Sequence, residues 1–137
     1  MGLTFEPAHY VYWDFIRKLR NNPDVKKGFV NQEHITVPAQ QSYMSWHWDN
    51  YYVAVDGGET VGYCGVVDDD IRFCVHPDSQ GKGYGSKMLD FLAETYPLAI
   101  GKVKHGNVPS SKAFGYAGYD LFKEDEEFLY YKLPDDI

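Results

Sequence analysis

The heptapeptide Gln-Gly-Lys-Gly-Tyr-Gly-Ser at residues 80–86 has the composition of a loop that binds phosphate groups. Glycines let the backbone approach a ligand without a Cβ atom in the way, and the free N–H groups at the start of a helix attract an anion. The heptapeptide follows an apolar run that ends at Val75 and precedes a helical pattern that begins near Gly83. It therefore predicts a site for the phosphate or pyrophosphate of a cofactor.

Spacing excludes two familiar phosphate-binding loops. A P-loop has four residues between its first Gly and a Gly-Lys-Ser/Thr triplet, whereas Gly85 is followed directly by Ser86. A dinucleotide fingerprint has two residues between its second and third glycines, whereas one residue separates Gly83 from Gly85. For the heptapeptide taken by itself, an ordinary glycine-rich turn stays open as an alternative.

The elements that must position this loop follow from hydrophobic spacing and turn residues. Asp56, Gly57 and Gly58 predict a tight hairpin between two β-rich runs. Pro77 ends the strand before the loop, and Pro97 ends the helix after it. In all, we expect strands at 3–6, 51–55, 61–67, 71–75, 98–103, 119–122 and 128–133, and helices at 8–19, 36–44, 83–96 and 109–117.

The longer run from Phe73 to Gly85 resembles the coenzyme A-binding signature of the GCN5-related N-acetyltransferase (GNAT) family, in which a strand is followed by Gln/Arg, two residues, Gly, one residue and Gly/Ala. A second family feature lies downstream, where Asn107 is followed at the family's spacing by Ser110, Phe114 and the pair Gly118-Tyr119. Two signatures at the right separation are more specific than either one. The resemblance covers roughly residues 51–133.

The resemblance implies an α/β fold of the α+β kind, with a mixed, mostly antiparallel sheet that splays between its fourth and fifth strands and is flanked by helices. It implies that pantetheine lies in the opening and that the pyrophosphate lies on the backbone amides of residues 81–86. No metal is implied. The expected cofactor-binding residues are Phe73, Cys74, Val75, Gln80, Gly81, Lys82, Gly83, Tyr84, Gly85, Ser86, Asn107, Lys112 and Phe114.

Two positions depart from the family pattern. Many members have a Tyr acid where this chain has Phe114, and the ribosomal-protein alanine N-acetyltransferases have a Glu base where it has Lys102. A coenzyme A thiol has a pKa of about 8.5, so its thiolate can leave without obligatory protonation. By analogy with other members we consider Asp69 and Asp70 as bases and Ser110 and Ser111 as acids; turn solvation for the first pair and helix capping for the second are the alternatives.

The acceptor side is less defined by the sequence. Trp46, Trp48, Tyr51 and Tyr52 are candidates for its wall, because the helix before the hairpin forms one wall of the acceptor cleft in this family; core packing is the alternative. His34, His47, His76 and His105 lack metal-ligand spacing. A cluster of acidic residues at 49–70 favours a cationic amine over an anionic one.

Composition bounds the remaining properties. A chain of 137 residues is expected to form one domain, 1–137, and its net charge of −7 disfavours nucleic acid as a partner. Two cysteines in apolar runs and a start without a signal-peptide pattern favour the cytoplasm, with no membrane partner. A homodimer is left open.

These features predict an N-acetyltransferase that moves the acetyl group of acetyl-CoA directly to a primary amine on a small molecule or a protein or peptide. Phe114 and Lys102 motivate an alternative, a non-catalytic acyl-CoA-binding module. A third reading is an interaction protein that keeps only the fold. Thiol release from acetyl-CoA distinguishes the transferase from the binding module, and coenzyme A binding distinguishes both of them from an interaction protein.

Overall fold

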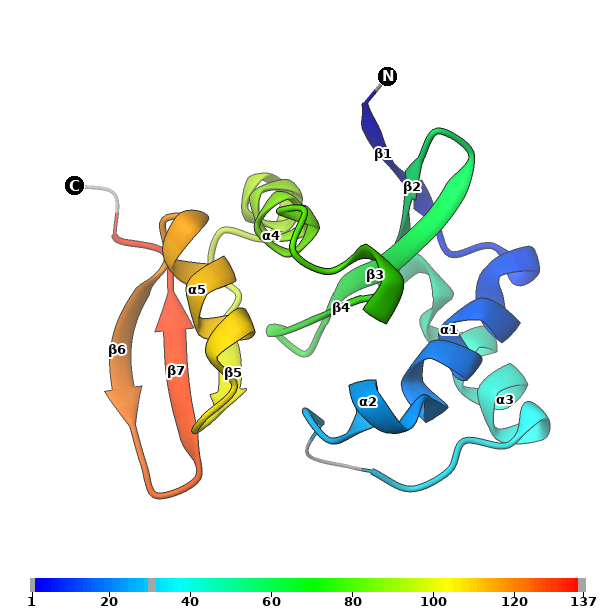
Figure 1. The fold of residues 1–137 in the computed structure, drawn as a ribbon, viewed down its shortest axis with the longest axis horizontal. Helices are drawn as coiled ribbons and strands as arrows, with labels where there is room; N and C mark the ends of the chain where they lie inside the picture. The colour runs from blue at the N-terminus through cyan, green and yellow to red at the C-terminus, as the bar shows by residue number, and fades with distance from the viewer. Residues whose placement is uncertain (1, 30–31, 136–137) are drawn as a thin grey trace.

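The structure, a computed structural model, describes residues 2–29 and 32–135. Its strands form two sheets that diverge, and helices cover both of them (Figure 1). In Figure 1 the sheet from the N-terminal half lies to the right, the sheet from the C-terminal half lies to the left, and α4 (Tyr84–Thr95) lies between them.

The first sheet has the strand order β1-β2-β3-β4 and is antiparallel throughout. The conformation of its turns depends on the residues within them. Gly57 (φ 59°) and Gly58 (φ 86°) take the left-handed conformation that the β2–β3 hairpin needs, and Asp68 and Asp69 take it in the turn between β3 and β4. The strands are β1 (Leu3–Pro7), β2 (Tyr51–Asp56), β3 (Glu59–Val67) and β4 (Asp70–Val75).

The second sheet, with the order β5-β7-β6, consists of β5 (Gly101–Lys104), β6 (Asp120–Glu124) and β7 (Phe128–Lys132). The two sheets meet at a parallel bridge between Asp70 and Ile100. There the N–H of Ile71 donates to the Ile100 carbonyl (2.9 Å), and the N–H of Ile100 donates to the Asp69 carbonyl (2.8 Å). Since no further β4–β5 pairing occurs among the described residues, the sheet opens between its fourth and fifth strands, as the sequence predicts.

The helices divide between the two faces of the first sheet. α1 (Trp13–Asn21), the one-turn α2 (Pro23–Lys26) and α3 (Val37–His47) lie on one side, while α4 and α5 (Val108–Tyr116) lie toward the second sheet (Figure 1). Side chains start three of them, since Asn22, Thr36 and Asn107 each accept a hydrogen bond from a first-turn N–H. Three 3-10 turns complete the chain: Tyr10–Tyr12, Trp48–Asn50 and Pro77–Ser79.

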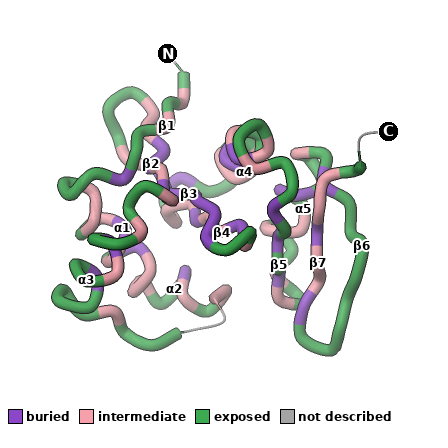
Figure 2. Tube along the Cα trace, turned by 180° about the vertical axis from the view of Figure 1, so that it is seen from behind, coloured by how far each residue is buried: buried purple, intermediate pink, exposed green. Residues whose placement is uncertain are grey.

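Successive residues of β4 face opposite sides of the sheet, and this alternation separates two cores. Ile71 packs in the cluster that holds Leu89 and Leu92 of α4, whereas Cys74 packs in the cluster that holds Ile16 of α1 and Met44 of α3. Figure 2 shows the buried positions along β3 and β4, with α4 on one side and α1 on the other. The even-numbered side chains of β4 therefore face the α1–α3 side.

Three expected elements differ from the observed ones. The helix expected at 8–19 begins as a 3-10 turn and becomes α-helical from Trp13 to Asn21. Asn22 and Pro23, which follow that helix, start α2, a helix outside the expected set, because an Asn cap followed by Pro is a favourable helix start. The strand expected at 98–103 is shorter, since residues 96–99 form a turn in which the Ala99 N–H donates to the Tyr96 carbonyl (3.2 Å).

Candidate functional site

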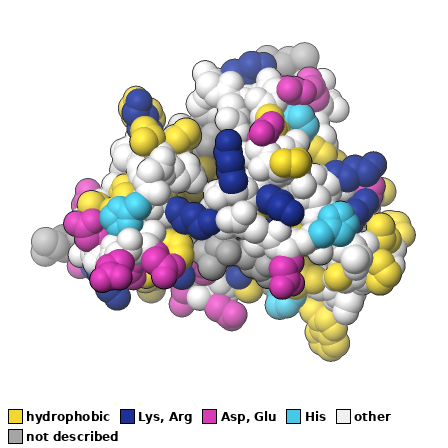
Figure 3. All heavy atoms as spheres, turned by 60° about the horizontal axis from the view of Figure 1, so that its bottom comes forward, with side chains coloured by type: hydrophobic (Ala, Val, Ile, Leu, Met, Phe, Trp, Pro, Cys, Tyr) yellow, Lys and Arg dark blue, Asp and Glu magenta, His cyan; other side chains and the backbone are white. Residues whose placement is uncertain are grey.

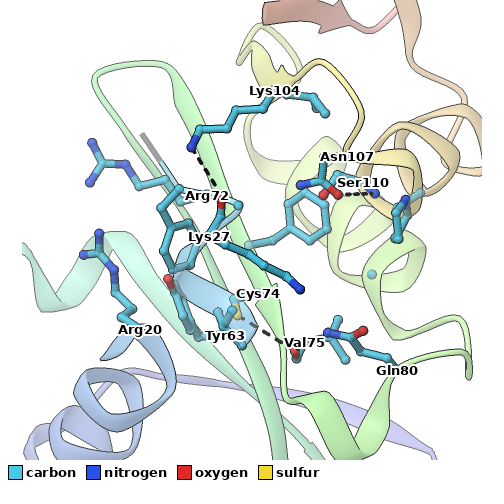
Figure 4. A pocket seen from close by; sticks show the side chains of 18 of the residues that line it. Arg20, Lys27, Tyr63, Arg72, Cys74, Val75, Gln80, Lys104, Asn107 and Ser110 are labelled. Atoms are coloured by element: carbon cyan, nitrogen blue, oxygen red, sulfur yellow. Dashed lines mark hydrogen bonds between the residues drawn. The ribbon is translucent and has the colours of Figure 1, made fainter. Parts of the chain in front are cut away.

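A cavity of about 1490 Å³ opens where the two sheets separate (Figure 4). β4 and β5 line it from the two sheets, and the beginnings of α4 and α5 also reach it. At one end lie the residues of the glycine-rich loop, and at the other lie residues of α1, α3 and the segment between them. The cavity thus runs from the glycine-rich loop to the α1–α3 side of the first sheet.

The glycine-rich loop has the conformation that a phosphate site requires. Gly81 and Gly83 both have φ of 80°, and a Cβ atom built on either one would meet no atom within 4 Å. The glycines are therefore needed for their backbone conformation, because the left-handed region disfavours residues with a side chain. Gly83 caps α4 without a side-chain hydrogen bond, which leaves the first N–H groups of this helix available to an anion.

Along β4, the residues expected to pair with pantetheine, Phe73, Cys74 and Val75, all line the cavity. β3 pairs with one edge of β4, and the other edge faces the opening beyond the Asp70–Ile100 bridge. The side chain of Gln80 donates to the Val75 carbonyl (3.3 Å) and ties the loop to the end of the strand. Twelve of the thirteen expected cofactor residues line the cavity; Lys82 does not.

Asn107 lies across the opening from β4, at the start of α5 (Figure 4). Its side-chain oxygen accepts a hydrogen bond from the Ser110 N–H (3.4 Å). A Cβ atom on Gly28 would stand 3.3 Å from Nδ2 of Asn107, and Nζ of Lys104 donates to the Lys27 carbonyl (3.3 Å). The segment that follows α2 therefore reaches across the cavity to β5 and α5.

Phe114, at the family's acid position, is a core residue. It is 1% exposed, stacks on Tyr131 with ring centroids 5.0 Å apart, and meets Phe73 and Tyr119 edge-on. Lys102 lies at the position where some members have a Glu base, and its Nζ is 4.1 Å from the centre of the Phe128 ring. Both line the cavity, but neither supplies the acid or base that the family pattern has at these positions.

The structure separates the four candidate catalytic residues. Asp70 and Ser110 line the cavity, whereas Asp69 and Ser111 do not. Asp69 is an exposed turn residue with φ of 62°, which fits the turn alternative. Asp70 begins β4, and its Oδ2 lies 3.4 Å from Nε of Arg72. Since side chains two residues apart in a strand share a face, both belong to the α1–α3 side.

The four aromatic residues expected in the acceptor wall are all described, and none of them lines the cavity. Trp46 is 82% exposed, Tyr51 is buried, and Tyr52 packs edge-on against Phe91. Core packing, the alternative to a place in the acceptor wall, thus holds for Tyr51 and Tyr52. Trp48 lies beside His9 instead (5.4 Å between ring centroids).

Other residues line this side of the cavity and are not among those expected from the sequence: Arg20, Tyr43, Tyr63 and Arg72. Nη1 of Arg72 donates to the hydroxyls of Tyr43 and Tyr51 (both 3.1 Å), which also share a 2.7 Å hydrogen bond. The one available signal was Arg72 itself, a charge inside the apolar run Ile71–Val75.

Burial raises the pKa of several groups on this side of the cavity. It raises the pKa of the Cys74 thiol to about 12 and the pKa of Tyr63 well above its usual value. Burial also raises the pKa of Tyr43, with its hydrogen bond to Tyr51 as a second cause. For Arg72, burial works to lower the pKa, but the nearby tyrosines and Asp70 raise it on balance, so the guanidinium stays charged.

Two further features are absent from residues 2–29 and 32–135. No group of three or more His, Cys, Asp and Glu side chains within this part is placed to hold a metal ion. Nor does any helix in it have the length and apolar character needed to cross a membrane.

A comparison with protein-family models finds a match. The model of the acetyltransferase (GNAT) domain matches residues 47–128, which is more than half of the chain. A comparison with curated proteins finds no match.

Among solved structures, spermidine N-acetyltransferase from Vibrio cholerae, in complex with CoA and spermine, is 13% identical with a TM-score of 0.80, and the match covers 93% of this chain and 94% of that one. AAC(6')-Ib, in complex with ribostamycin and coenzyme A, is 17% identical with a TM-score of 0.77, covering 96% and 92%. yncA from Salmonella typhimurium, with acetyl-CoA, is 16% identical with a TM-score of 0.77, covering 99% and 96%. At these identities the structures show a common fold.

Proposed function

Because this chain belongs to the acetyltransferase (GNAT) family, we propose that it transfers the acetyl group of acetyl-CoA directly to a primary amine on a small molecule or a protein. Family membership makes it an acetyl-CoA-dependent acetyltransferase; the amine, the direct transfer and the residues involved are the proposal. It acts as one domain, residues 1–137, in the cytoplasm, where its two buried cysteines stay reduced.

The observation that carries this proposal is the glycine-rich start of α4 at one end of the cavity. The backbone N–H groups after Gly83 have no capping side chain, and the positive end of the helix dipole lies there, so a pyrophosphate would be held by fixed donors. The unpaired edge of β4 leads from this point toward Asp70. Pantetheine bound along the edge would carry its thioester toward the α1–α3 end.

In the reaction, the neutral amine attacks the thioester carbonyl carbon, a C–N bond forms, the C–S bond breaks, and coenzyme A leaves as a thiolate that takes up the proton lost by the nitrogen as it becomes an amide. The proton lost by the ammonium passes through a water to Asp70, the candidate base that lines the cavity. The Arg72 guanidinium lies beside this carboxylate, with its Nε 3.4 Å from Oδ2 of Asp70.

The leaving thiolate needs little help, since a free thiol has a pKa of about 8.5. Ser110 is the candidate hydroxyl on the cavity wall, and it would donate a hydrogen bond to the sulfur as the C–S bond breaks. Positioning of the two substrates in one cavity supplies most of the rate.

One observation favours the alternative, a non-catalytic acyl-CoA-binding module: Phe114 is buried among aromatic rings where many members have a catalytic Tyr. Both readings require acetyl-CoA to bind. At a hundred times its dissociation constant, acetyl-CoA should stabilise the fold by about 2.7 kcal/mol, seen as a rise in Tm. No rise at millimolar acetyl-CoA contradicts both readings.

The deciding experiment measures free thiol released from acetyl-CoA with and without a panel of primary amines. Amine-dependent release supports the transferase. A Tm rise with acetyl-CoA but no release with any amine would support the binding module. The protein's own thiols should add little background, because Cys64 and Cys74 are both buried.

A further inference from the structure

Two arginines from distant parts of the chain lie on the α1–α3 side of the cavity. Arg20 comes from the last turn of α1, and Arg72 comes from the middle of β4. In Figure 4 both lie on the side away from Asn107 and Ser110. Nη1 of Arg72 donates to the Tyr43 hydroxyl (3.1 Å), and Tyr43 and Arg20 line the same cavity.

Arg72 is held in a fixed position. Its Nη1 donates to the hydroxyl oxygens of Tyr43 and Tyr51, and its Nε faces the Asp70 carboxylate at 3.4 Å. These contacts use Nε and Nη1, which lie on different edges of a guanidinium that has five N–H donors, so the group is held from two sides. A guanidinium fixed in this way is suited to bind a planar anion through its other donors.

Arg20 lies over the Phe29 ring, 5.3 Å from its centre. Its Nε is buried and has no hydrogen-bond partner among residues 2–29 and 32–135. A buried donor without a partner is unfavourable, and a water or another acceptor from outside the chain would satisfy it.

The cavity differs in charge from the chain as a whole. The chain has 13 Lys and Arg against 20 Asp and Glu, but among its described residues six Lys and Arg line the cavity against three Asp and Glu. One of the three, Asp70, is paired with Arg72. Figure 3 shows several Lys and Arg side chains near the middle of the lower face of the molecule. The cavity therefore favours an anion, although the net charge of −7 by itself favours a cation.

The phosphates of coenzyme A do not account for the two arginines. The glycine-rich loop that would hold the pyrophosphate follows β4, whereas Arg72 lies nearer the other end of this strand, on the face that α1 and α3 cover. Arg20 belongs to α1, which lies against that same face. Both arginines are thus placed where the acceptor would lie, not along the phosphates.

We propose that the acceptor carries an anionic group, a carboxylate or a phosphate, near its primary amine, and that Arg20 and Arg72 bind this group. The proposal rests on the proposed N-acetyltransferase function. It replaces the cationic acceptor expected from net charge, since the charges that line a cavity act on its ligand at shorter range than those on the surface. With the anion bound by the arginines, the amine is directed toward the thioester.

The test uses amines that differ only in the anionic group: β-alanine against β-alaninamide, and O-phosphoethanolamine against ethanolamine. Thiol release should give a kcat/KM at least about tenfold higher for one anionic member than for its neutral partner. The two pairs distinguish a carboxylate from a phosphate. Higher or equal kcat/KM for both neutral members, or for spermine, overturns the anion site while leaving the transferase intact.

Variants then connect the preference to the arginines. Arg20→Gln and Arg72→Gln should each lower the ratio of anionic to neutral kcat/KM by about tenfold or more, with the Tm rise on acetyl-CoA unchanged. Lys18→Gln, which removes an exposed charge from the same helix as Arg20, is the matched control and should keep the ratio. An unchanged ratio in both arginine variants contradicts the proposal.

A binding measurement covers the case in which no amine is acetylated. With coenzyme A present, N-acetyl-β-alanine should raise Tm more than its amide does, and Arg20→Gln should remove the difference. N-acetyl-O-phosphoethanolamine against N-acetylethanolamine tests a phosphate in the same way. Thiol release with neutral amines and none with anionic ones would contradict the anion site alone, whereas selective anion binding without release from any amine would contradict the transferase alone. Equal binding within both pairs overturns the anion site.

Discussion

The tip of the Phe114 ring lies against Gly101: a Cβ atom built on Gly101 would stand 2.1 Å from Cζ of Phe114. β5 begins with a residue that has no side chain, and the aromatic ring fills that space. The para carbon of the ring, where a Tyr would carry its hydroxyl, is therefore packed against the backbone of β5. This packing decides what a substitution at the family's acid position would do.

Phe114→Tyr is accordingly expected to lower stability without adding an acid. A hydroxyl at this position has to be accommodated beside Gly101, and overpacking of this kind costs about 1–3 kcal/mol. Tm should fall, and thiol release should not increase at low pH, where an added acid would help most. Increased turnover below pH 7 with an unchanged Tm would mean that the hydroxyl reaches the thioester.

Gly85→Ala tests the cofactor site without straining the backbone. Its Cβ would lie 3.4 Å from Ala113 and from Phe73, an ordinary contact, and Ala favours a helix. Stability should be kept, while a methyl group on the cavity wall should weaken acetyl-CoA and reduce the Tm rise. Gly115→Ala, in a helix but outside the cavity lining, is the control and should bind acetyl-CoA normally. Equal Tm rises in both variants contradict the placement of the cofactor.

Gly83 is a poorer place for this test. Its φ of 80° strains any residue with a side chain, and a branched one such as Val most of all. Loss of acetyl-CoA binding in Gly83→Val would therefore not distinguish a distorted loop from a blocked phosphate site.

Asp70→Asn should slow turnover by about a hundredfold to ten-thousandfold at neutral pH, because the amide cannot accept the proton of the ammonium. Asp69→Asn is the matched control: Asn tolerates the left-handed conformation of the turn, and this residue is outside the cavity lining. Rates are compared by thiol release at saturating acetyl-CoA. If the two variants behave alike, Asp70 is not the base.

Ser110→Ala should slow turnover about tenfold, and the loss should shrink above pH 8.5, where the thiolate is already the stable form. Ser111→Ala should have no such effect, because this residue does not line the cavity. The pH profile separates the role of an acid from a loss of packing, which would be independent of pH. Wild-type rates in both variants would mean that no protein acid assists the thiolate.

Alkaline pH should destabilise the fold through Cys74. Burial raises the pKa of its thiol to about 12, whereas the unfolded chain loses this proton near pH 8.5–9. Between these values the folded state binds the extra proton, so the stability is complete below about pH 9 and falls as pH rises toward 12, by up to about 1.4 kcal/mol per pH unit. Cys74→Ala should flatten this slope in urea melts. A slope equal to that of the wild type would contradict the prediction.

The sequence by itself determined the parts of this protein that depend on neighbouring residues. Gly57 and Gly58 fix the hairpin, and Gly81 and Gly83 fix the loop before α4, because each takes a backbone conformation that a side chain would oppose. The two family signatures extended this local chemistry to the cofactor. The opening between β4 and β5 followed from them and was confirmed.

Tertiary structure decided which side chains meet. Arg20 and Arg72 are 52 positions apart, and only the packing of α1 on the even-numbered face of β4 brings them to one cavity wall. The sequence showed which side chains of β4 share a face of the sheet. It did not show which of the two faces α1 packs against. The α1–α3 end of the cavity was therefore hidden in the sequence, since its residues are joined by contacts across the fold and by no local pattern.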